Sequence, residues 1–433
     1  MTRTPETASI IPDASTKDRS QLGAAHSPSL LARLGRRGLL AQFAQLRDGE
    51  LTLIEPDGRT HHFGRRTSRL DLAVTLRIDH PQLYADAAFG GTVGAGEAYI
   101  RGLWRCDDLT GLVRLFVANR DLMNAMDSRF AIVSRPLLKM FHWLHRNSRT
   151  GSARNIAAHY DLGNALYELM LDPTMAYSCG IFTSLDATLE QASLAKFDAV
   201  CRKLALQPGD RVVEIGTGWG GLAIHAASRY GCHVTTTTIS REQHEYTREK
   251  IARLGLGDRI TLLLEDYRDL TGRYDKAFSI EMIEAVGADY LDTYLRKCSE
   301  LLAPHGAMLL QAITIQDQFY AQARRSVDYI QRFIFPGSFI PSVSVISDSL
   351  TRVTDLKLFH LEDIGPHYAR TLASWRRNFF SNIDRVRALG YPESFVRLWE
   401  FYLCYCEGGF AERQLGDVQL LLTKPDCRLP ALA

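Results

Sequence analysis

A glycine-rich stretch at residues 211–221, Arg-Val-Val-Glu-Ile-Gly-Thr-Gly-Trp-Gly-Gly, constrains the fold of this chain more than any other feature. The β-branched residues near its start predict a strand that is buried on both faces. Gly216 and Gly218 then allow a tight turn and let the backbone approach a ligand closely, because no Cβ intervenes. Residues 222–230 continue with helical spacing. The stretch therefore predicts a strand, a turn and a helix N-terminus, which is where open α/β sheets bind ligands.

The same glycines are compatible with two different cofactors. Gly216, Gly218 and Gly221 match Gly-x-Gly-x-x-Gly, the dinucleotide fingerprint. A dinucleotide site also needs an acidic residue about 20 positions further on, at the end of the second strand. The second predicted strand, at residues 233–240, ends without a carboxylate. Glu214, two residues before the first glycine, instead resembles the S-adenosylmethionine (SAM) motif of Rossmann-like methyltransferases. SAM is therefore favoured over NAD, and a purely structural turn is the last alternative.

The chain length and the cysteine content indicate a large protein that works in a reducing compartment. With 433 residues the chain exceeds a typical single domain, so two domains are expected. Its 8 cysteines lack Cys-x-x-Cys or zinc spacing, which predicts reduced thiols, no metal site and a cytoplasmic location. Neither a signal peptide nor an apolar run of about 18 residues is evident. Basic clusters in residues 1–150 permit contact with an anionic surface. No nucleic-acid partner is expected.

Composition and pattern divide the chain into a tail and two domains. Residues 1–28 are rich in Thr, Ser, Pro, Asp and Ala without periodicity, which predicts a disordered tail. Residues 29–150 predict a small α+β domain that contacts lipid or dimerises. Its strands are expected at 51–54 and 72–78, and a helix from Leu109 to about Asn124.

Residues 134–149 are the most suggestive stretch of this first domain. Apolar side chains share one helical face and basic side chains flank it: Leu137, Leu138, Phe141, Leu144, Arg135, Lys139, Arg146 and Arg149. The pattern fits an interfacial anchor for lipid headgroups. An ordinary amphipathic helix packed on its own core is the favoured alternative.

Residues 151–433 alternate strands and helices at a spacing that predicts a mostly parallel, doubly wound α/β sheet of Rossmann-like type. Residues of about 315–375 break this alternation and predict a helical insertion that caps the crevice. The predicted strands are 211–215, 233–238, 260–264, 276–280, 307–313 and 418–423, and the predicted helices include 186–204, 241–253, 290–302, 376–390 and 394–410.

Five motifs resemble those of the cyclopropane-fatty-acyl-phospholipid synthases, with plant-type features. The motifs lie at 159–164 (His-Tyr-Asp-Leu-Gly-Asn), 177–180 (Tyr-Ser-Cys-Gly), 213–221, 266–270 (Asp-Tyr-Arg-Asp-Leu) and 329–337 (Tyr-Ile-Gln-Arg-Phe-Ile-Phe-Pro-Gly). The resemblance implies methyl transfer from SAM to a cis double bond of an unsaturated phospholipid acyl chain, giving a cyclopropane fatty acid. It also implies peripheral contact with the inner membrane surface and a homodimer.

The resemblance assigns cofactor contacts to several positions. Gly216 and Gly218 would approach the amino-acid part of SAM, and Asp266 and Tyr267 would address the adenine. Asp266 has an alternative role as a turn cap. The remaining implied contacts are Tyr177 and Ser178 over the cofactor, and Thr238, Ile239 and Gln243 near the ribose.

The implied chemistry needs shielding and a base. An alkene is a poor nucleophile, and methyl transfer to it leaves a carbocation that π faces and negative charge can stabilise. A base must then remove a proton from the added methyl group before the ring can close. The resemblance implies that this base is a bicarbonate ion held by Cys179, Glu284, Tyr368 and the backbone around Ile280. Cys179 would act through its backbone N–H.

Several positions bear on the outcome of this chemistry. Glu281 and Glu284 stand among apolar neighbours, which is unusual for a solvated face. Gln311 and Ala285 replace histidines that are common in the bacterial enzymes, as in plant-type synthases. Ring closure is therefore one outcome, and a methylene- or methyl-branched chain is the other.

Cys406 aligns with a cysteine once proposed as a nucleophile, although a buried structural thiol is the favoured role. Small-molecule methylation and non-catalytic lipid binding are the alternative functions.

Overall fold

The computed structural model describes residues 29–120 and 162–430, which form two compact units. The predicted tail and the amphipathic stretch at 134–149 lie outside the described residues. Within them, the second unit holds most of the residues from 162 onward. Segments 327–336 and 390–412 belong to the first unit, an arrangement that a single division near residue 150 did not anticipate.

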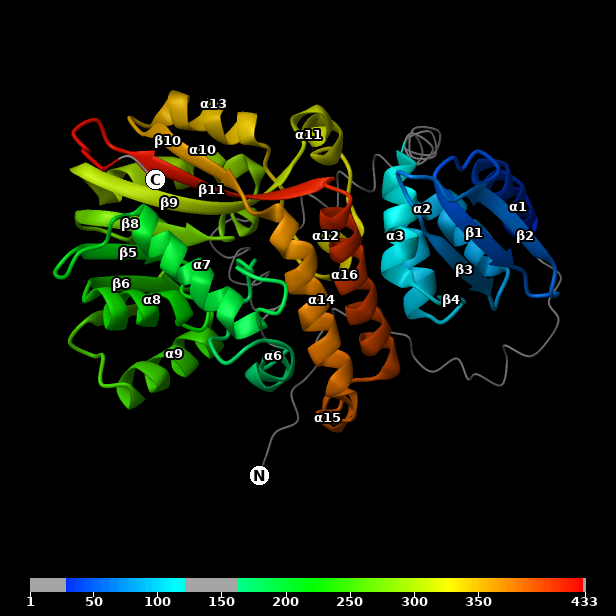
Figure 1. The fold of residues 1–433 in the computed structure, drawn as a ribbon, viewed down its shortest axis with the longest axis horizontal. Coiled ribbons are helices and arrows are strands. Elements are labelled where there is room, and N and C mark those ends of the chain that lie inside the picture. The colour runs from blue at the N-terminus through cyan, green and yellow to red at the C-terminus, as the bar shows by residue number, and fades with distance from the viewer. Residues whose placement is uncertain (1–28, 121–161, 431–433) are drawn as a thin grey trace. The chain divides into compact units, whose positions relative to one another are not determined.

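The first unit contains a four-stranded sheet in the order β2-β1-β3-β4. β1 pairs antiparallel with β2 and parallel with β3, so the strands predicted at 51–54 and 72–78 are confirmed. The helix predicted from Leu109 begins there, because the Asp108 side chain accepts from the Gly111 N–H. The elements are α1 (Leu30–Phe43), β1 (Gly49–Ile54), β2 (Thr60–Arg65), β3 (Ala73–Ile78), α2 (Gln82–Ile100), β4 (Trp104–Cys106), α3 (Leu109–Ala118), α12 (Tyr329–Phe333) and α16 (Glu393–Ala411) (Figure 1).

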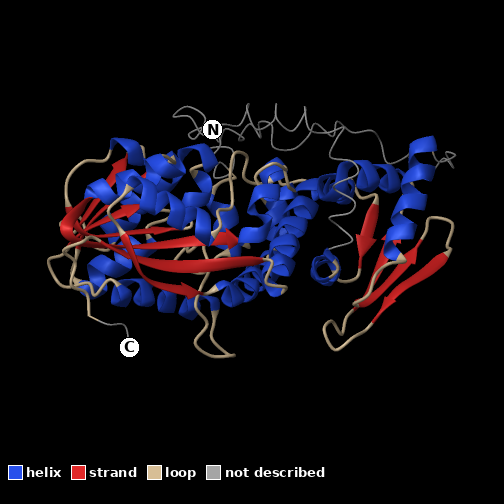
Figure 2. Ribbon diagram, turned by 90° about the horizontal axis from the view of Figure 1, so that it is seen from above, coloured by secondary structure: helices blue, strands red, loops and turns tan. Residues whose placement is uncertain are grey.

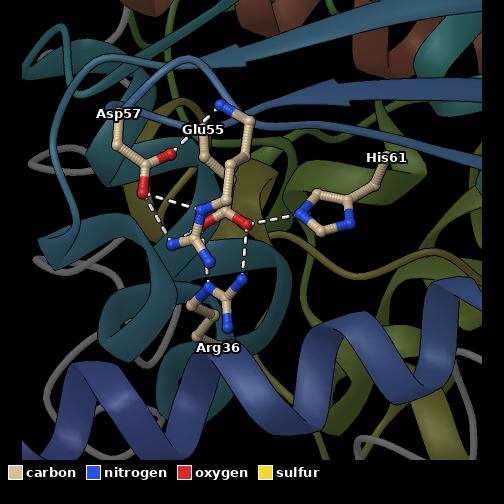
Figure 3. A network of polar contacts seen from close by, with 5 residues as sticks. Arg36, Glu55, Asp57 and His61 are labelled. Carbon is tan, nitrogen blue, oxygen red and sulfur yellow. Dashed lines mark hydrogen bonds and ion pairs between the residues drawn. The ribbon is translucent and has the colours of Figure 1, made fainter.

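A buried glutamate connects α1 to the β1–β2 hairpin. Glu55 directly follows β1 and is 4% exposed. Arg36 donates to both of its oxygens, at 2.7 Å from Nε and 2.5 Å from Nη2, and the His61 Nε2 lies 2.5 Å from Oε1 (Figure 3). The hydrogen bonds from Arg36 lower the pKa of Glu55 to about 2. This carboxylate is therefore ionised at every physiological pH.

The second unit is built on a seven-stranded sheet in the order β10-β11-β9-β8-β5-β6-β7. The strands from β7 to β9 are parallel, whereas β11 is antiparallel to β9 and to β10. This confirms the predicted Rossmann-like class. The strands are β5 (Arg211–Ile215), β6 (His233–Thr238), β7 (Ile260–Leu264), β8 (Tyr274–Ile280), β9 (Leu302–Ile315), β10 (Lys357–Asp363) and β11 (Leu415–Thr423).

Helices cover both faces of this second sheet (Figure 2). Val213 and Leu310 lie in the core on one face, whereas Val212, Phe278 and Leu309 lie in the core on the other. The sheet is therefore buried on both sides, as the β-branched run predicts. The helices are α6 (Asn164–Met170), α7 (Leu189–Lys203), α8 (Gly221–His225), α9 (Arg241–Arg253), α10 (Leu291–Leu301), α11 (Asp317–Ala323), α13 (Val343–Val353), α14 (Gly365–Ser381) and α15 (Ile383–Ala388).

The insertion expected at about 315–375 is helical only in part. It holds α11 and α13, but it also holds β10, which joins the sheet beside β11. Because β10 is an edge strand with mostly exposed side chains, its sequence lacks the alternation that marks a half-buried strand. Among residues 29–120 and 162–430, no helix is long and apolar enough to cross a membrane.

Candidate active site

The glycine turn after β5 has the conformation that its sequence predicts. Gly216 and Gly218 have φ values of 99° and 52°. The N–H groups of Gly216 and Thr217 donate to the Thr237 carbonyl, which fixes the turn against the end of β6. A Cβ on Gly218 would meet no described atom within 4 Å, whereas one on Gly220 would lie 2.6 Å from Thr247 Cγ2. Gly218 therefore leaves open space for a ligand, and Gly220 is needed for packing.

Glu214 is buried beneath this turn. Its carboxyl accepts a hydrogen bond from the Thr236 hydroxyl of the neighbouring strand. Burial raises the pKa of Glu214 to about 8. The Glu214 carboxyl is therefore protonated at neutral pH and connects β5 to β6 as a neutral group.

The residues predicted near the ribose lie together after β6. The Thr238 hydroxyl donates to Gln243 Oε1 at 3.0 Å and accepts from the Ser240 N–H at 3.1 Å. Thr238 and Gln243 are buried, and Ile239 between them is half-buried. The three positions border the turn that follows β6.

The two residues predicted near the adenine, Asp266 and Tyr267, make contacts with other residues of the protein. Asp266 accepts from the Arg268 N–H and forms two side-chain bonds with Arg268, at 2.8 and 2.6 Å. This is the alternative turn-cap role. Tyr267 is buried, with its ring edge-on to Tyr294 at 5.5 Å between centroids. Contact of Asp266 and Tyr267 with adenine stays a prediction.

An aromatic cluster surrounds Tyr177. Its ring centroid lies 5.3 Å from that of Tyr167, 5.0 Å from Trp375 and 6.5 Å from Trp219. Tyr368 packs edge-on against Trp375 at 6.1 Å. Aromatic faces attract cations, so this cluster is suited to a positively charged methyl donor and to a carbocation.

One hydrogen bond connects this cluster to a neighbouring motif, and a second connects Ser178 to a buried lysine. Trp219 of the glycine turn donates through Nε1 to Asn164 Oδ1 at 2.7 Å, and Asn164 closes the motif at 159–164. Ser178, next to Tyr177, accepts from the buried Lys196 Nζ at 2.7 Å. Burial lowers the pKa of Lys196, whereas the nearby Glu281 raises it. Asn164 and the motifs at 177–180 and 213–221 thus meet in one place.

Glu281 is the centre of a buried polar network that the sequence did not assign. It directly follows β8, and its carboxylate accepts from the Cys179 N–H and from Gln311 Nε2, both at 2.8 Å. The Tyr368 hydroxyl donates to its other oxygen. Ile280 pairs with Gln311 across β8 and β9, and this register brings Gln311 next to Glu281, the residue that follows Ile280. The residues predicted to surround an anion therefore meet around a protein carboxylate.

Asp417, on β11, extends this network and was also missed. Gln311 Nε2 donates to Asp417 Oδ2 at 2.9 Å, and Gln311 Oε1 accepts from Gln419 Nε2 at 3.0 Å. Asp417 is completely buried, and burial, together with the charges of Glu281 and Glu284, raises its pKa well above the usual value. Two carboxyl groups this close cannot both ionise, so Asp417 is protonated.

Glu284 is half-buried, and one oxygen of its carboxyl is inaccessible to solvent. Its Oε1 accepts from the Ile313 N–H at 2.5 Å, and Oε2 is buried without a hydrogen-bond partner among the described residues. Burial, and then the charge of Glu281, raises the pKa of Glu284 to about 8. The Glu284 carboxyl is therefore mainly neutral at pH 7.

The surroundings of Glu281 bear on the bicarbonate expected at this place. The Cys179 N–H, the Tyr368 hydroxyl and Gln311 all donate to Glu281. Because these donors already bind the Glu281 carboxyl, they are not available to hold a separate anion. Bicarbonate binding stays a prediction, which these contacts do not favour.

Neither predicted cysteine has the properties of a nucleophile. Burial raises the pKa of the Cys179 thiol well above its usual value, and its Sγ donates to the Gly180 carbonyl. Cys406 lies on α16 in the first unit, where burial and the charge of Asp328 raise its pKa. Both thiols are protonated at neutral pH, which supports the structural role for Cys406.

The chain matches a known family over most of its length. A family model described as mycolic acid cyclopropane synthetase matches residues 147–420. The chain is 38% identical to tuberculostearic acid methyltransferase UfaA1 of Mycobacterium tuberculosis over 343 residues, which cover 77% of this chain and 79% of that protein. It is 35% identical to cyclopropane-fatty-acyl-phospholipid synthase of Escherichia coli K12 over 346 residues, covering 80% of this chain and 86% of that protein.

Solved structures agree with these matches. The crystal structure of mycolic acid cyclopropane synthase CmaA1 complexed with SAH and CTAB has a TM-score of 0.59 and 28% identity to the chain. It covers 63% of this chain and 98% of that one. The cyclopropane synthase MmaA2 from Mycobacterium tuberculosis has a TM-score of 0.58 at the same identity and the same coverage of both chains.

Proposed function

Because the chain belongs to the mycolic acid cyclopropane synthetase family, and is thus a SAM-dependent methyltransferase, we propose that it modifies unsaturated phospholipids. The proposed reaction adds one carbon from SAM to a cis double bond of an acyl chain and gives a cyclopropane fatty acid. SAM supplies a methyl group on a positively charged sulfur.

One observation carries this proposal: the aromatic cluster around Tyr177 adjoins the glycine turn, in the same unit as the two half-buried glutamates Glu281 and Glu284. Tyr177 and Trp375 present π faces that stabilise positive charge on the acyl chain. Glu281 adds negative charge and a proton-accepting group, and the mainly neutral Glu284 adds a second carboxyl group, in surroundings shielded from water. Methyl transfer to oxygen or nitrogen leaves no carbocation on a chain carbon, so in such a reaction the π faces would serve only the methyl donor.

The relatives' names leave two products open. One relative is named a tuberculostearic acid methyltransferase, another a probable fatty acid methyltransferase of Pseudomonas putida, and a third a cyclopropane synthase. We therefore keep a methylene- or methyl-branched chain as the alternative product. A saturated methyl branch would require a hydride donor in addition to SAM.

The test is incubation of the protein with SAM and vesicles of a monounsaturated phospholipid, followed by mass analysis of the released fatty acids. We expect a one-carbon mass gain, absent with vesicles of the saturated phospholipid, and the fragmentation pattern separates ring from branch. No mass gain with folded protein that binds SAM would refute the proposal. Methylation of a soluble acceptor without vesicles would favour a small-molecule substrate instead. Tight vesicle binding without SAM consumption would favour a lipid-binding protein.

We also propose that the protein works in the cytoplasm, on the inner membrane surface and as a homodimer. The basic residues of 1–150 support the membrane contact, since anionic headgroups attract them. Co-sedimentation with anionic and neutral vesicles tests this contact, and light scattering in solution tests the dimer.

A further inference from the structure

We propose that Glu281 is the built-in base of this enzyme, in the place that the family resemblance gives to bicarbonate, and that Asp417 positions it through a shared proton. This inference rests on the proposed function. It concerns the residue that removes the proton after methyl transfer.

The donors that would hold a free anion all bind this side chain. The Cys179 N–H and Gln311 Nε2 donate to one Glu281 oxygen, each at 2.8 Å, and the Tyr368 hydroxyl donates to the other. These donors come from three separate parts of the second unit, namely the 177–180 motif, β9 and α14. Their convergence on one carboxylate is the geometry of an anion site in which the anion is part of the chain.

Among the three carboxyl groups of the network, Glu281 is the one that carries the negative charge. Three donors stabilise its ionised form, and the buried Lys196 ammonium adds a favourable charge. Glu284 receives one hydrogen bond from a described neighbour, through Oε1 from the Ile313 N–H. Asp417 Oδ2 accepts from Gln311, whereas its Oδ1 is buried and accepts no N–H or hydroxyl from the described residues. The hydrogen bond between the Asp417 and Glu281 carboxyl groups needs one proton, which Asp417 holds and donates to Glu281.

Glu281 also lies close to the expected place of reaction. Tyr368, which donates to it, packs on Trp375, and Trp375 packs on Tyr177. The next residue, Met282, lies against the glycine turn, since a Cβ on Gly216 would be 3.1 Å from Met282 Cγ. The carboxylate is thus one side chain away from both the aromatic cluster and the predicted cofactor turn.

The backbone conformation of Glu281 also points to a functional role. Glu281 has a φ of 49°, in the left-handed region that L side chains rarely adopt. Strained backbone of this kind persists where the surroundings fix it, and it concentrates at functional sites. A glycine would adopt this φ without strain, so Glu281→Gly keeps the backbone conformation while removing the carboxylate.

The proton balance of the step is complete without another reactant. The alkene electron pair forms a bond to the methyl carbon as the carbon–sulfur bond breaks, and a cation remains on the adjacent chain carbon. Glu281 accepts a proton from the added methyl group, and the C–H electron pair closes the third bond of the ring. The proton then leaves to water, and the Glu281–Asp417 pair again holds one proton.

The experiment compares the full-length protein with Glu281→Gly, using ¹³C-labelled bicarbonate as the probe. Binding is followed by ¹³C NMR, and turnover is measured in bicarbonate-depleted buffer and after bicarbonate is added back. We expect the unmodified protein to show no saturable bicarbonate binding and no change of turnover on depletion. Glu281→Gly should lose turnover by about 100-fold or more, bind bicarbonate, and recover part of its turnover when bicarbonate is added. Glu300→Gln, at an exposed position of α10, is the matched control.

Three results would overturn the inference: saturable bicarbonate binding by the unmodified protein, loss of its turnover on depletion, or full turnover of Glu281→Gly without bicarbonate. If Glu281→Gly fails to fold, the two measurements on the unmodified protein still decide. The binding measurement needs no lipid, so it separates this inference from the proposed function. Absence of any lipid product from the unmodified protein would overturn the function alone.

Discussion

Two glutamates, Glu55 and Glu281, each follow the last residue of a strand and each take part in several side-chain hydrogen bonds, yet their electrostatics differ. In the first unit, Glu55 faces the Arg36 guanidinium and the His61 ring (Figure 3), and its pKa is lowered to about 2. In the second unit, Glu281 is held by a backbone N–H, an amide and a hydroxyl, and burial raises its pKa. Direct hydrogen bonds from a guanidinium keep Glu55 ionised, whereas these three hydrogen bonds to Glu281 come from neutral donors and the Lys196 charge acts on it through space, which leaves it able to accept a proton.

The largest expected effect is a loss of turnover when Glu281 can no longer accept a proton. Glu281→Gln keeps the shape of the side chain but cannot accept a proton. We expect the turnover of phospholipid to fall by about 10²- to 10⁴-fold, the usual contribution of general acid–base catalysis. SAM binding, measured by calorimetry, should persist, because Glu281 lies outside the glycine turn.

Glu284→Gln is the informative comparison for this variant. Since the Glu284 carboxyl has a pKa of about 8 and is mainly neutral at pH 7, an amide imitates its resting state. Glu284→Gln should therefore lose less turnover than Glu281→Gln. The reverse order would return the role of base to Glu284 or to an ion that it holds.

The network around Glu281 also shows which parts of the structure the sequence could predict. The strand, the glycine turn and the helix after residue 211 were predictable because their determinants are local: β-branched residues, two glycines and helical spacing. The resemblance assigned the Cys179 N–H, Glu284 and Tyr368 to an anion site, and two of these, the Cys179 N–H and Tyr368, bind Glu281 together with Gln311. The occupant was missed, although Glu281 among apolar neighbours was a visible signal. Asp417 had no such signal, because only the pairing of β11 with β9 brings it to the site.

The second expected effect is on stability. Glu55→Gln removes the negative charge beside Arg36, whose side chain is 28% exposed and thus partly solvated. We expect the free energy of unfolding of the first unit to fall by about 1.5–3 kcal/mol, the range for hydrogen bonds to charged groups. Native-state amide hydrogen exchange of β1 and β2 measures this loss, since the two units need not unfold together.

Turnover provides the control for Glu55→Gln. At a temperature where the variant remains folded, its turnover should equal that of the unmodified protein. Lost turnover with unchanged hydrogen exchange would show that Glu55 takes part in the reaction, and the contrast between the two glutamates would then fail.

The third expected effect is a shift in pH dependence. The groups that bear on Glu281 are Lys196 from α7, Tyr368 from α14, Asp417 from β11 and Glu284. The hydrogen bond from Asp417 lowers the pKa of Glu281. Asp417→Ala should therefore raise that pKa and move the acidic limb of the kcat/KM profile upward by about 1–2 pH units. Asp417→Asn should restore most of the shift, because its amide still donates. Equal profiles for both variants would exclude a positioning role.

The smallest expected effect appears when Glu55 is titrated. Its pKa is about 2 in the folded protein and near 4.5 without its partners, so its charge stabilises the first unit fully above about pH 4.5. That contribution is lost as the pH falls toward 2. The stability difference between the unmodified protein and Glu55→Gln, measured by the same hydrogen exchange, should therefore be constant from pH 7 to about 5 and shrink below it. A difference that disappears already near neutral pH would mean that Glu55 titrates as Glu281 does, and that Arg36 does not fix its charge.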